Sequence, residues 1–129
     1  MRLARMTAVA GLLMLWGCGG GGPSESEVES AVLRDYLDGI EKQLSSVSAM
    51  VGEKRATEAV FSNYGISDLS DVGLDAFSLE DLRALDNGDY LAKTVYTLRR
   101  GDNQDKRAAR LTLTRLEGQW RVIDKEFLD

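Results

Sequence analysis

Cys18 is the only cysteine in the chain, and histidine is absent. A Ser-His-Asp or Cys-His catalytic pair, a Cys/His zinc site and an intrachain disulfide are therefore all excluded within this sequence. The acid–base groups that remain are carboxylates and the phenols of Tyr36, Tyr64, Tyr90 and Tyr96, and no base partner for them stands out. We therefore expect no catalytic residues, no cofactor and no metal site, and hence a protein that is not an enzyme.

One acidic stretch deserves a test for calcium binding. Residues 66–75 include Asp68, Asp71 and Asp75 among serines and a glycine. The stretch lacks the alternating oxygen ligands, the central glycine and the closing glutamate of an EF-hand loop. We interpret it as a turn-rich connector.

The first 17 residues have the architecture of a secretory signal peptide. Arg2 and Arg5 supply a positive start, residues 6–16 are apolar, and Gly17 is small. A permanent transmembrane helix needs roughly 20 apolar residues, so this stretch is too short for one. The predicted organisation is a signal peptide over residues 1–17, Cys18 with a glycine-rich tether over 18–26, and one globular domain over 27–129.

The end of this signal resembles the lipobox of bacterial lipoproteins, in the residues Leu15-Trp16-Gly17-Cys18. Trp16 stands where that family has a small residue. The resemblance implies cleavage between Gly17 and Cys18, lipidation of Cys18, and a membrane-anchored protein that faces the periplasm. It also implies the outer membrane where the host has one, since Gly19 and not Asp follows the cysteine. The alternatives are an ordinary secreted protein or an uncleaved apolar N-terminus.

The charge of the chain argues against a nucleic-acid partner. The 16 basic residues face 21 acidic ones, and cleavage before Cys18 would remove two arginines and leave 14 basic residues. The basic residues gather late in the sequence, and the candidate interaction patch consists of Arg99, Arg100, Lys106, Arg107 and Arg110. Such a patch would suit an anionic partner such as lipid headgroups or wall carboxylates. The alternative is a set of solvated strand charges that guard sheet edges.

Two amphipathic helices are expected after Pro23. A capping box is formed either by Ser24 with Glu27 or by Ser26 with Glu29. Apolar residues then recur at helical spacing and define one buried face: Val28, Val32, Tyr36, Ile40 and Leu44. The serine-rich run 45–48 weakens this helix. A second helix is expected to follow and to stop within 63–65, with these residues inward: Met50, Val51, Val60, Phe61 and Tyr64.

The last fifty residues change to the spacing of strands. Residues 77–85 predict a strand, although Ser78 with Asp81 could also cap a short helix. Asn87-Gly88 predicts a type I′ hairpin turn into a strand over 90–99. A polar loop over 100–105 leads to a strand over 107–116, and a turn over 117–119 leads to the last strand.

This order predicts an α+β fold, in which two N-terminal amphipathic helices pack on a curved antiparallel sheet of three to four strands. The expected core fillers are Phe61, Phe77, Trp120 and Phe127. Asp124 lies on the same strand as Trp120 and could face the concave side.

The final hairpin resembles that of small bacterial lipoproteins with a cystatin-like or NTF2-like domain, in the residues Leu116-Glu117-Gly118-Gln119-Trp120-Arg121-Val122-Ile123-Asp124. Asn87-Gly88-Asp89-Tyr90-Leu91-Ala92-Lys93-Thr94-Val95 is similar to a turn and strand of the same group. The resemblance implies a cone-like fold whose concave sheet binds a small ligand or a partner, and it does not imply one activity.

Two functions are therefore open. The first is a non-catalytic interaction module in the bacterial cell envelope, which binds another envelope protein or an anionic wall or lipid surface. The second is a protein that binds a small or lipid-like molecule on the concave sheet face, which would need a cavity of about 300 Å³ or more. The short domain favours the first.

Overall fold

Helix α2 (Glu25–Val51) begins where a capping box predicts it. In this computed structural model, which describes residues 22–128, the Ser24 hydroxyl accepts a hydrogen bond from the Glu27 backbone N–H at 3.2 Å. The Glu27 carboxylate accepts one from the Ser24 backbone N–H at 2.9 Å. The first of the two capping alternatives is confirmed, and Ser26 and Glu29 lie inside the helix.

The folded domain starts before residue 27. Pro23 is already buried, and a Cβ added at Gly22 would lie 2.9 Å from the Tyr90 ring. The tether predicted for residues 18–26 therefore ends too late, because the capping box fixes the first helical turn at Glu25.

The serine-rich run does not interrupt α2, which continues through it to Val51. Leu44 and Val47 still pack against the core on either side of the exposed Ser45 and Ser46, so packing overrides the weak helix propensity of serine. The helix ends at Gly52, whose φ of 91° and ψ of 160° turn the chain into α3 (Glu53–Tyr64).

The prediction that Met50 and Val51 face inward is wrong. Met50 is 81% exposed and Val51 is 46% exposed, because both lie on the last turn of α2, next to the corner at Gly52. Val60 is buried, and Phe61 and Tyr64 are half-buried, as predicted. The predicted stop is also confirmed, since Gly65 caps α3 with a left-handed φ of 75°.

Gly39 lies in the middle of α2 without a packing reason. A Cβ built at this position meets nothing within 4 Å, and its φ is not positive. Glycine inside a helix costs about 0.5–1 kcal/mol relative to alanine. We therefore expect Gly39→Ala to raise the free energy of unfolding by about that amount, measured by urea denaturation. A decrease would show that something packs closely against this face.

Four strands form one antiparallel sheet in the order β2 (Val72–Ala84), β3 (Tyr90–Arg100), β4 (Asn103–Leu116), β5 (Gln119–Leu128). The short 3-10 turn η2 (Leu69–Asp71) precedes the sheet. Residues 77–84 are a strand as predicted, but β2 starts earlier, at Val72, so the connector is shorter than expected. The α+β order of two helices followed by an antiparallel meander is confirmed.

The hairpin turns differ from their predictions. At Asn87-Gly88 only the glycine has a positive φ, of 92°, and Gly88 N–H donates to Leu85 C=O at 3.2 Å. This is a three-residue loop with a glycine bulge, so the predicted type I′ turn is wrong. The type I′ geometry occurs instead at Glu117-Gly118, where φ is 54° and 80°.

The loop between β3 and β4 is shorter than the predicted range 100–105. Arg100 pairs directly with Asn103, so only Gly101 and Asp102 form the turn. Gly101 has a φ of 59°, which suits the first position of a two-residue hairpin turn. β4 therefore gains four residues that the sequence pattern assigned to a loop or left unassigned, namely 103–106.

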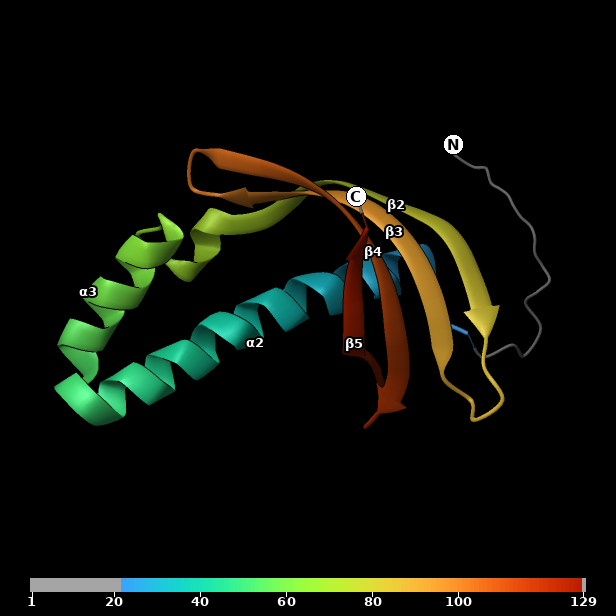
Figure 1. Cartoon of the computed structure of the whole chain (residues 1–129), viewed down its shortest axis with the longest axis horizontal. Coiled ribbons are helices and arrows are strands. Elements are labelled where there is room, and N and C mark those ends of the chain that lie inside the picture. The colour runs from blue at the N-terminus through green and yellow to red at the C-terminus, as the bar shows by residue number, and fades with distance from the viewer. Residues whose placement is uncertain (1–21, 129) are drawn as a thin grey trace.

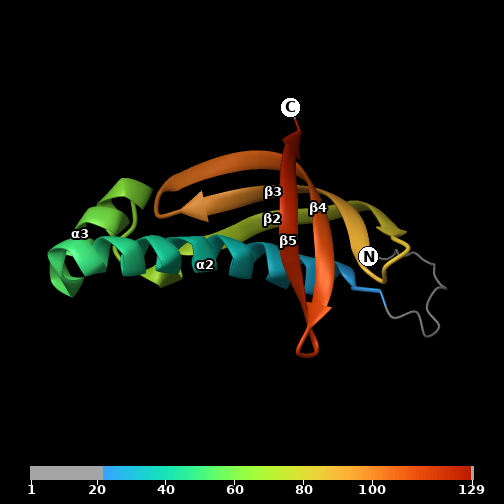
Figure 2. The ribbon, with the colours of Figure 1, turned by 60° about the horizontal axis from the view of Figure 1, so that its bottom comes forward.

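Helix α2 covers the concave side of the curved sheet, and strand β5 crosses over α2 (Figures 1 and 2). Helix α3 packs mainly on α2 and not on the middle of the sheet. The buried core joins the inner faces of α2 and of the strands, and its largest fully buried side chains are Val28, Ile40, Thr94, Leu98, Leu111 and Leu113. The one buried polar side chain among residues 22–128, Thr94, donates its hydroxyl to Ala109 C=O at 3.0 Å.

Candidate functional site

Strand β4 extends beyond its neighbour β5. The pairing of β4 with β5 ends at Ala108↔Leu128, whereas β4 pairs with β3 back to Asn103. Residues 103–107, here called the free end of β4, therefore have a strand on one side only among the described residues. Figure 1 shows the β3–β4 hairpin, which contains this free end, reaching past β5 towards α3.

The tip of the β3–β4 hairpin, next to the free end of β4, contacts α3 and η2. Gly101 N–H donates to Asp71 C=O at 3.0 Å, and a Cβ on Gly101 would lie 2.7 Å from Gly65 C=O. The hairpin tip thus rests on the C-terminal end of α3 and on η2. Unlike a loose loop, the free end is a fixed edge.

This contact gives a matched pair of glycine substitutions. Gly101→Ala is expected to lower the free energy of unfolding more than Gly88→Ala, whose positive φ costs about 1–2 kcal/mol with no steric contact. Both have a positive φ, but only Gly101 meets a backbone oxygen. Thermal unfolding of the two variants measures the difference. Equal losses would mean that the hairpin tip does not rest on α3.

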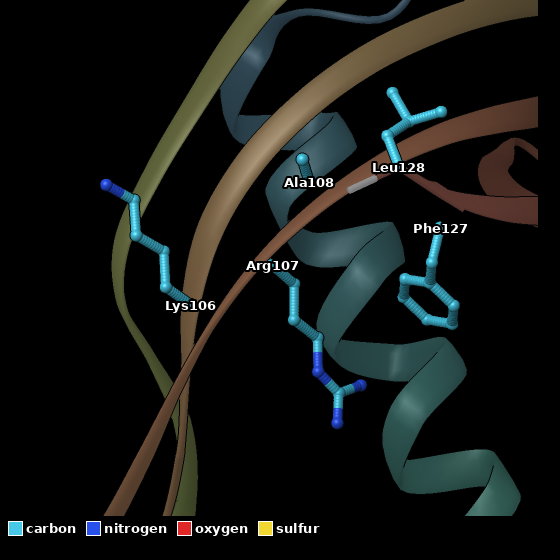
Figure 3. A pocket seen from close by; sticks show the side chains of 5 residues that line it. All are labelled: Lys106, Arg107, Ala108, Phe127 and Leu128. Carbon is cyan, nitrogen blue, oxygen red and sulfur yellow. The ribbon is translucent and has the colours of Figure 1, made fainter.

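Alternation along β4 sorts the side chains of the free end. Asp105 and Arg107 have the same parity as the buried Ala109, Leu111 and Leu113, so they face α2. Gln104 and Lys106 point to the outer face. The close view in Figure 3 agrees, since Arg107 and Lys106 leave the strand on opposite sides.

Arg107 lies between two aromatic rings. Its Cζ is 5.4 Å from the Phe127 ring centre and 5.9 Å from the Tyr36 ring centre. Both distances are within the range of a cation–π contact. Phe127 is 51% exposed, so one wall of this arrangement is open to solvent.

One carboxylate serves two guanidinium groups here. Asp105 Oδ2 is 2.8 Å from Arg100 Nη2 and 3.8 Å from Arg107 Nη2. The buried Nε of Arg100 has no hydrogen-bond partner among the described residues. We call Tyr36, Arg100, Asp105, Arg107 and Phe127 the Arg107 cluster; it carries more positive than negative charge.

Two phenols, that of Tyr36 within this cluster and that of Tyr96 near it, do not act as bases near neutral pH. Burial raises the pKa of Tyr36 above its ordinary value of 10.0, against the opposing charges of Arg100 and Arg107. Burial likewise raises the pKa of Tyr96, against Arg107 and Lys125. Both phenols stay protonated near neutral pH, so they offer aromatic and hydrogen-bond contacts and do not serve as proton acceptors.

One enclosed cavity lies between α2 and the sheet. It is beside Val32, Tyr96 and Leu111 and measures about 20 Å³, enough for about one water molecule. An open groove of about 850 Å³ lies between α2 and β5 and is lined mainly by charged and polar residues. An open hollow of about 330 Å³ lies outside the enclosed cavity, where β5 ends (Figure 3). Its lining residues are Lys106, Arg107, Ala108, Phe127 and Leu128.

The five residues of the predicted patch lie on both sides of the sheet. Arg99, Lys106 and Arg110 share the outer face, whereas Arg100 and Arg107 share the inner one. Arg99 binds Asp75 at 2.6 Å and Arg110 binds Glu126 at 2.9 Å. Lys106 forms no ion pair among residues 22–128, and only Arg100 and Arg107 meet around one carboxylate.

A bulge in β5 decides which C-terminal residues join the site. The register shifts between Thr112 and Leu113 of β4, which leaves Ile123 without a partner. Beyond the bulge Lys125 and Phe127 face inward, and Lys125 Nζ contacts Asp35 of α2 at 2.5 Å. Asp124 therefore turns outward, contrary to expectation, and Phe127 is half-exposed and not a core filler.

The predicted lipidation site, Cys18 with Gly17 before it, lies outside the described residues. Within residues 22–128 no helix has the length and apolarity to span a membrane. The same residues contain no group of three or more Cys, Asp or Glu side chains arranged to hold a metal ion. No family model, no curated protein and no solved structure matches this chain.

Proposed function

We propose that this chain is a lipid-anchored bacterial envelope protein whose folded domain binds another envelope protein without catalysing a reaction. The anchor is a diacylglyceryl group on Cys18, with cleavage after Gly17 in the lipobox-like residues 15–18. Each buried methylene contributes about 0.8 kcal/mol, and two or more acyl chains give stable attachment. The protein faces the periplasm. Gly19, which follows the cysteine, directs it to the outer membrane where the host has one.

The domain belongs, in this proposal, with the cystatin-like or NTF2-like lipoproteins. The order of two helices and an antiparallel meander, with α2 against the concave sheet, supports this placement. The Glu117-Gly118 turn followed by the buried Trp120 supports it too. Fold alone assigns no activity, so the function has to come from the site.

The observation that carries the binding function is the free end of β4 next to the Arg107 cluster. It combines a strand edge that has no neighbouring strand among residues 22–128, cations in excess over carboxylates and the exposed Phe127 ring. Edges of this kind, with aromatic and arginine side chains, are typical of protein-binding surfaces. The alternative, a small ligand under α2, is disfavoured because the enclosed cavity beside Val32, Tyr96 and Leu111 is about 20 Å³. The groove of about 850 Å³ between α2 and β5 is open and lined mainly by charged and polar residues, unlike the mostly apolar lining of a small-molecule site.

Site-specific photocrosslinking in intact cells tests this function. A benzophenone side chain is placed at Lys106 on the free end of β4, and as a control at Lys54, an exposed residue of α3. We expect one discrete protein adduct from position 106 and none from position 54. Adducts at both positions, none at either, or a lipid adduct at 106 would contradict a protein-binding function at this edge.

A further inference from the structure

Among residues 22–128 the free end of β4 has neither of the two devices that block the other sheet edges, a bulge or a covered N–H group, and only the charge of Lys106 guards it. The outer edge of β2 has bulges at Asp75 and Glu80, and the Glu25 carboxylate accepts a hydrogen bond from Leu79 N–H at 2.9 Å. The outer edge of β5 has a bulge at Ile123. Bulges and covered N–H groups prevent strand addition. The free end of β4 pairs with β3 without a register shift.

From this contrast we infer that the free end of β4 is completed by an extended acidic segment of a partner protein, which adds as a strand in line with β5. This inference names the partner's chemistry at the site of the proposed function and rests on that function. Strand addition draws its affinity from main-chain hydrogen bonds and its specificity from side-chain pockets. The free end of β4 offers an edge for main-chain hydrogen bonds, and the hollow beside Phe127 offers a pocket for a side chain.

Charge selects the acidic partner. Lys106 has no carboxylate partner among residues 22–128, and Asp105 is shared by Arg100 and Arg107. Lysine on a strand edge discourages pairing with a like-charged strand. An acidic strand is instead attracted by Lys106, and such charge complementarity speeds association and selects the partner.

The hollow of about 330 Å³ at the end of β5 fits a side chain of that segment. Ala108 and Leu128 give it apolar surface, and the half-exposed Phe127 ring forms one wall (Figure 3). An apolar residue of the added strand would cover Phe127 on the inner face, while the acidic residues next to it lie on the outer face and meet Lys106. Because α3 and η2 already hold the hairpin tip, little ordering of this edge is needed on binding.

A designed peptide tests the inference with the full chain purified in detergent. The probe is a fluorescein-labelled hexapeptide of alternating Glu and Val. One comparison peptide has Lys in place of Glu, and another has N-methyl groups on alternate amides. Fluorescence anisotropy measures binding, and amide hydrogen exchange measures protection of residues 103–107.

We expect the Glu peptide to bind at least tenfold more tightly than either comparison peptide and to slow exchange within residues 103–107. Lys106→Glu should weaken its binding at least tenfold. The matched control Lys93→Glu, an exposed lysine on the outer face of β3, should change it less than twofold.

Equal binding of the Lys peptide, insensitivity to N-methylation, protection elsewhere, or absence of binding would each overturn strand addition. A dimeric mass in light scattering without peptide, abolished by Lys106→Glu, would overturn it in favour of a second copy. The outcomes separate this inference from the proposed function. A protein adduct at position 106 that the Glu peptide does not displace keeps the function and overturns the strand. Peptide binding without any adduct in cells overturns the protein-binding function, and with it the partner strand, and leaves only an edge that accepts a strand in vitro.

Discussion

Replacement of Trp120 by alanine is expected to lower the free energy of unfolding by about 3–5 kcal/mol, the usual cost of deleting a large buried aromatic side chain. Trp120 is only 7% exposed, and its ring meets the edge of Tyr90 at 5.5 Å between ring centres. It lies, with Ala31 of α2, along the hollow between the final hairpin and the first turns of α2. Urea denaturation followed by circular dichroism measures the loss.

A second aromatic residue on the same strand serves as the control. Phe127 is 51% exposed, so Phe127→Ala should cost much less than Trp120→Ala. A Trp120 variant as stable as the parent would mean that the ring does not support the hairpin. Contacts other than those of the Trp120 ring would then hold β5 against α2.

Replacement of Cys18 by serine is expected to abolish membrane attachment. Serine removes the only thiol in the chain, so no thioether to a diacylglyceryl group can form. The protein should move from the detergent phase to the aqueous or unprocessed fraction and lose labelling by an alkyne fatty acid. Phase separation with a cloud-point detergent, followed by fluorescence of the attached label, measures both.

Trp16 provides the matched control for this experiment. Trp16→Ala restores the small residue that the lipobox pattern has at this position, so we expect equal or faster processing with labelling retained. A Cys18→Ser protein that still partitions into detergent and still takes up the label would contradict lipidation at this residue.

The start of α2 and the strands β3 and β4 could be predicted because their signals are local. Ser24 with Glu27, one of the two predicted capping boxes, sets the start of α2, and the predicted strands over 90–99 and 107–116 coincide with most of β3 and β4. The length of α2 could not be predicted, since the packing of Leu44 and Val47 against distant residues outweighs the local preference of the serines.

Bulges account for most of the remaining differences. In β2 the core-facing residues Leu74, Phe77, Leu79 and Leu82 are spaced by three, two and three, because Asp75 and Glu80 lack partners. That spacing imitates a helix and explains why residues 77–85 read ambiguously. In β5 the bulge at Ile123 reverses the alternation and brings Phe127 to the inner face.

The free end of β4 was beyond local reasoning for another reason. The polar sequence between Arg100 and Asp105 is typical of a loop, yet the two-residue turn at Gly101-Asp102 adds it to the strands. Whether a strand outlasts its neighbour depends on the register set by the next turn, at Glu117-Gly118. The Arg107 cluster follows from that register and not from any motif.

Under the proposed lipidation of Cys18, the place where the chain enters the domain limits how far the protein can act from a bilayer. Gly22 lies against Tyr90, at the end of the molecule with the β2–β3 and β4–β5 hairpins, and α2 leads away from there to the corner at Gly52. A helix of 27 residues is about 40 Å long, and the seven residues 18–24 span at most about 25 Å. With a lipid on Cys18, the outermost corner would stand no more than about 65 Å above the headgroups. A partner would have to come within that height, so soluble proteins in the wider periplasm would be met only when they approach the membrane surface.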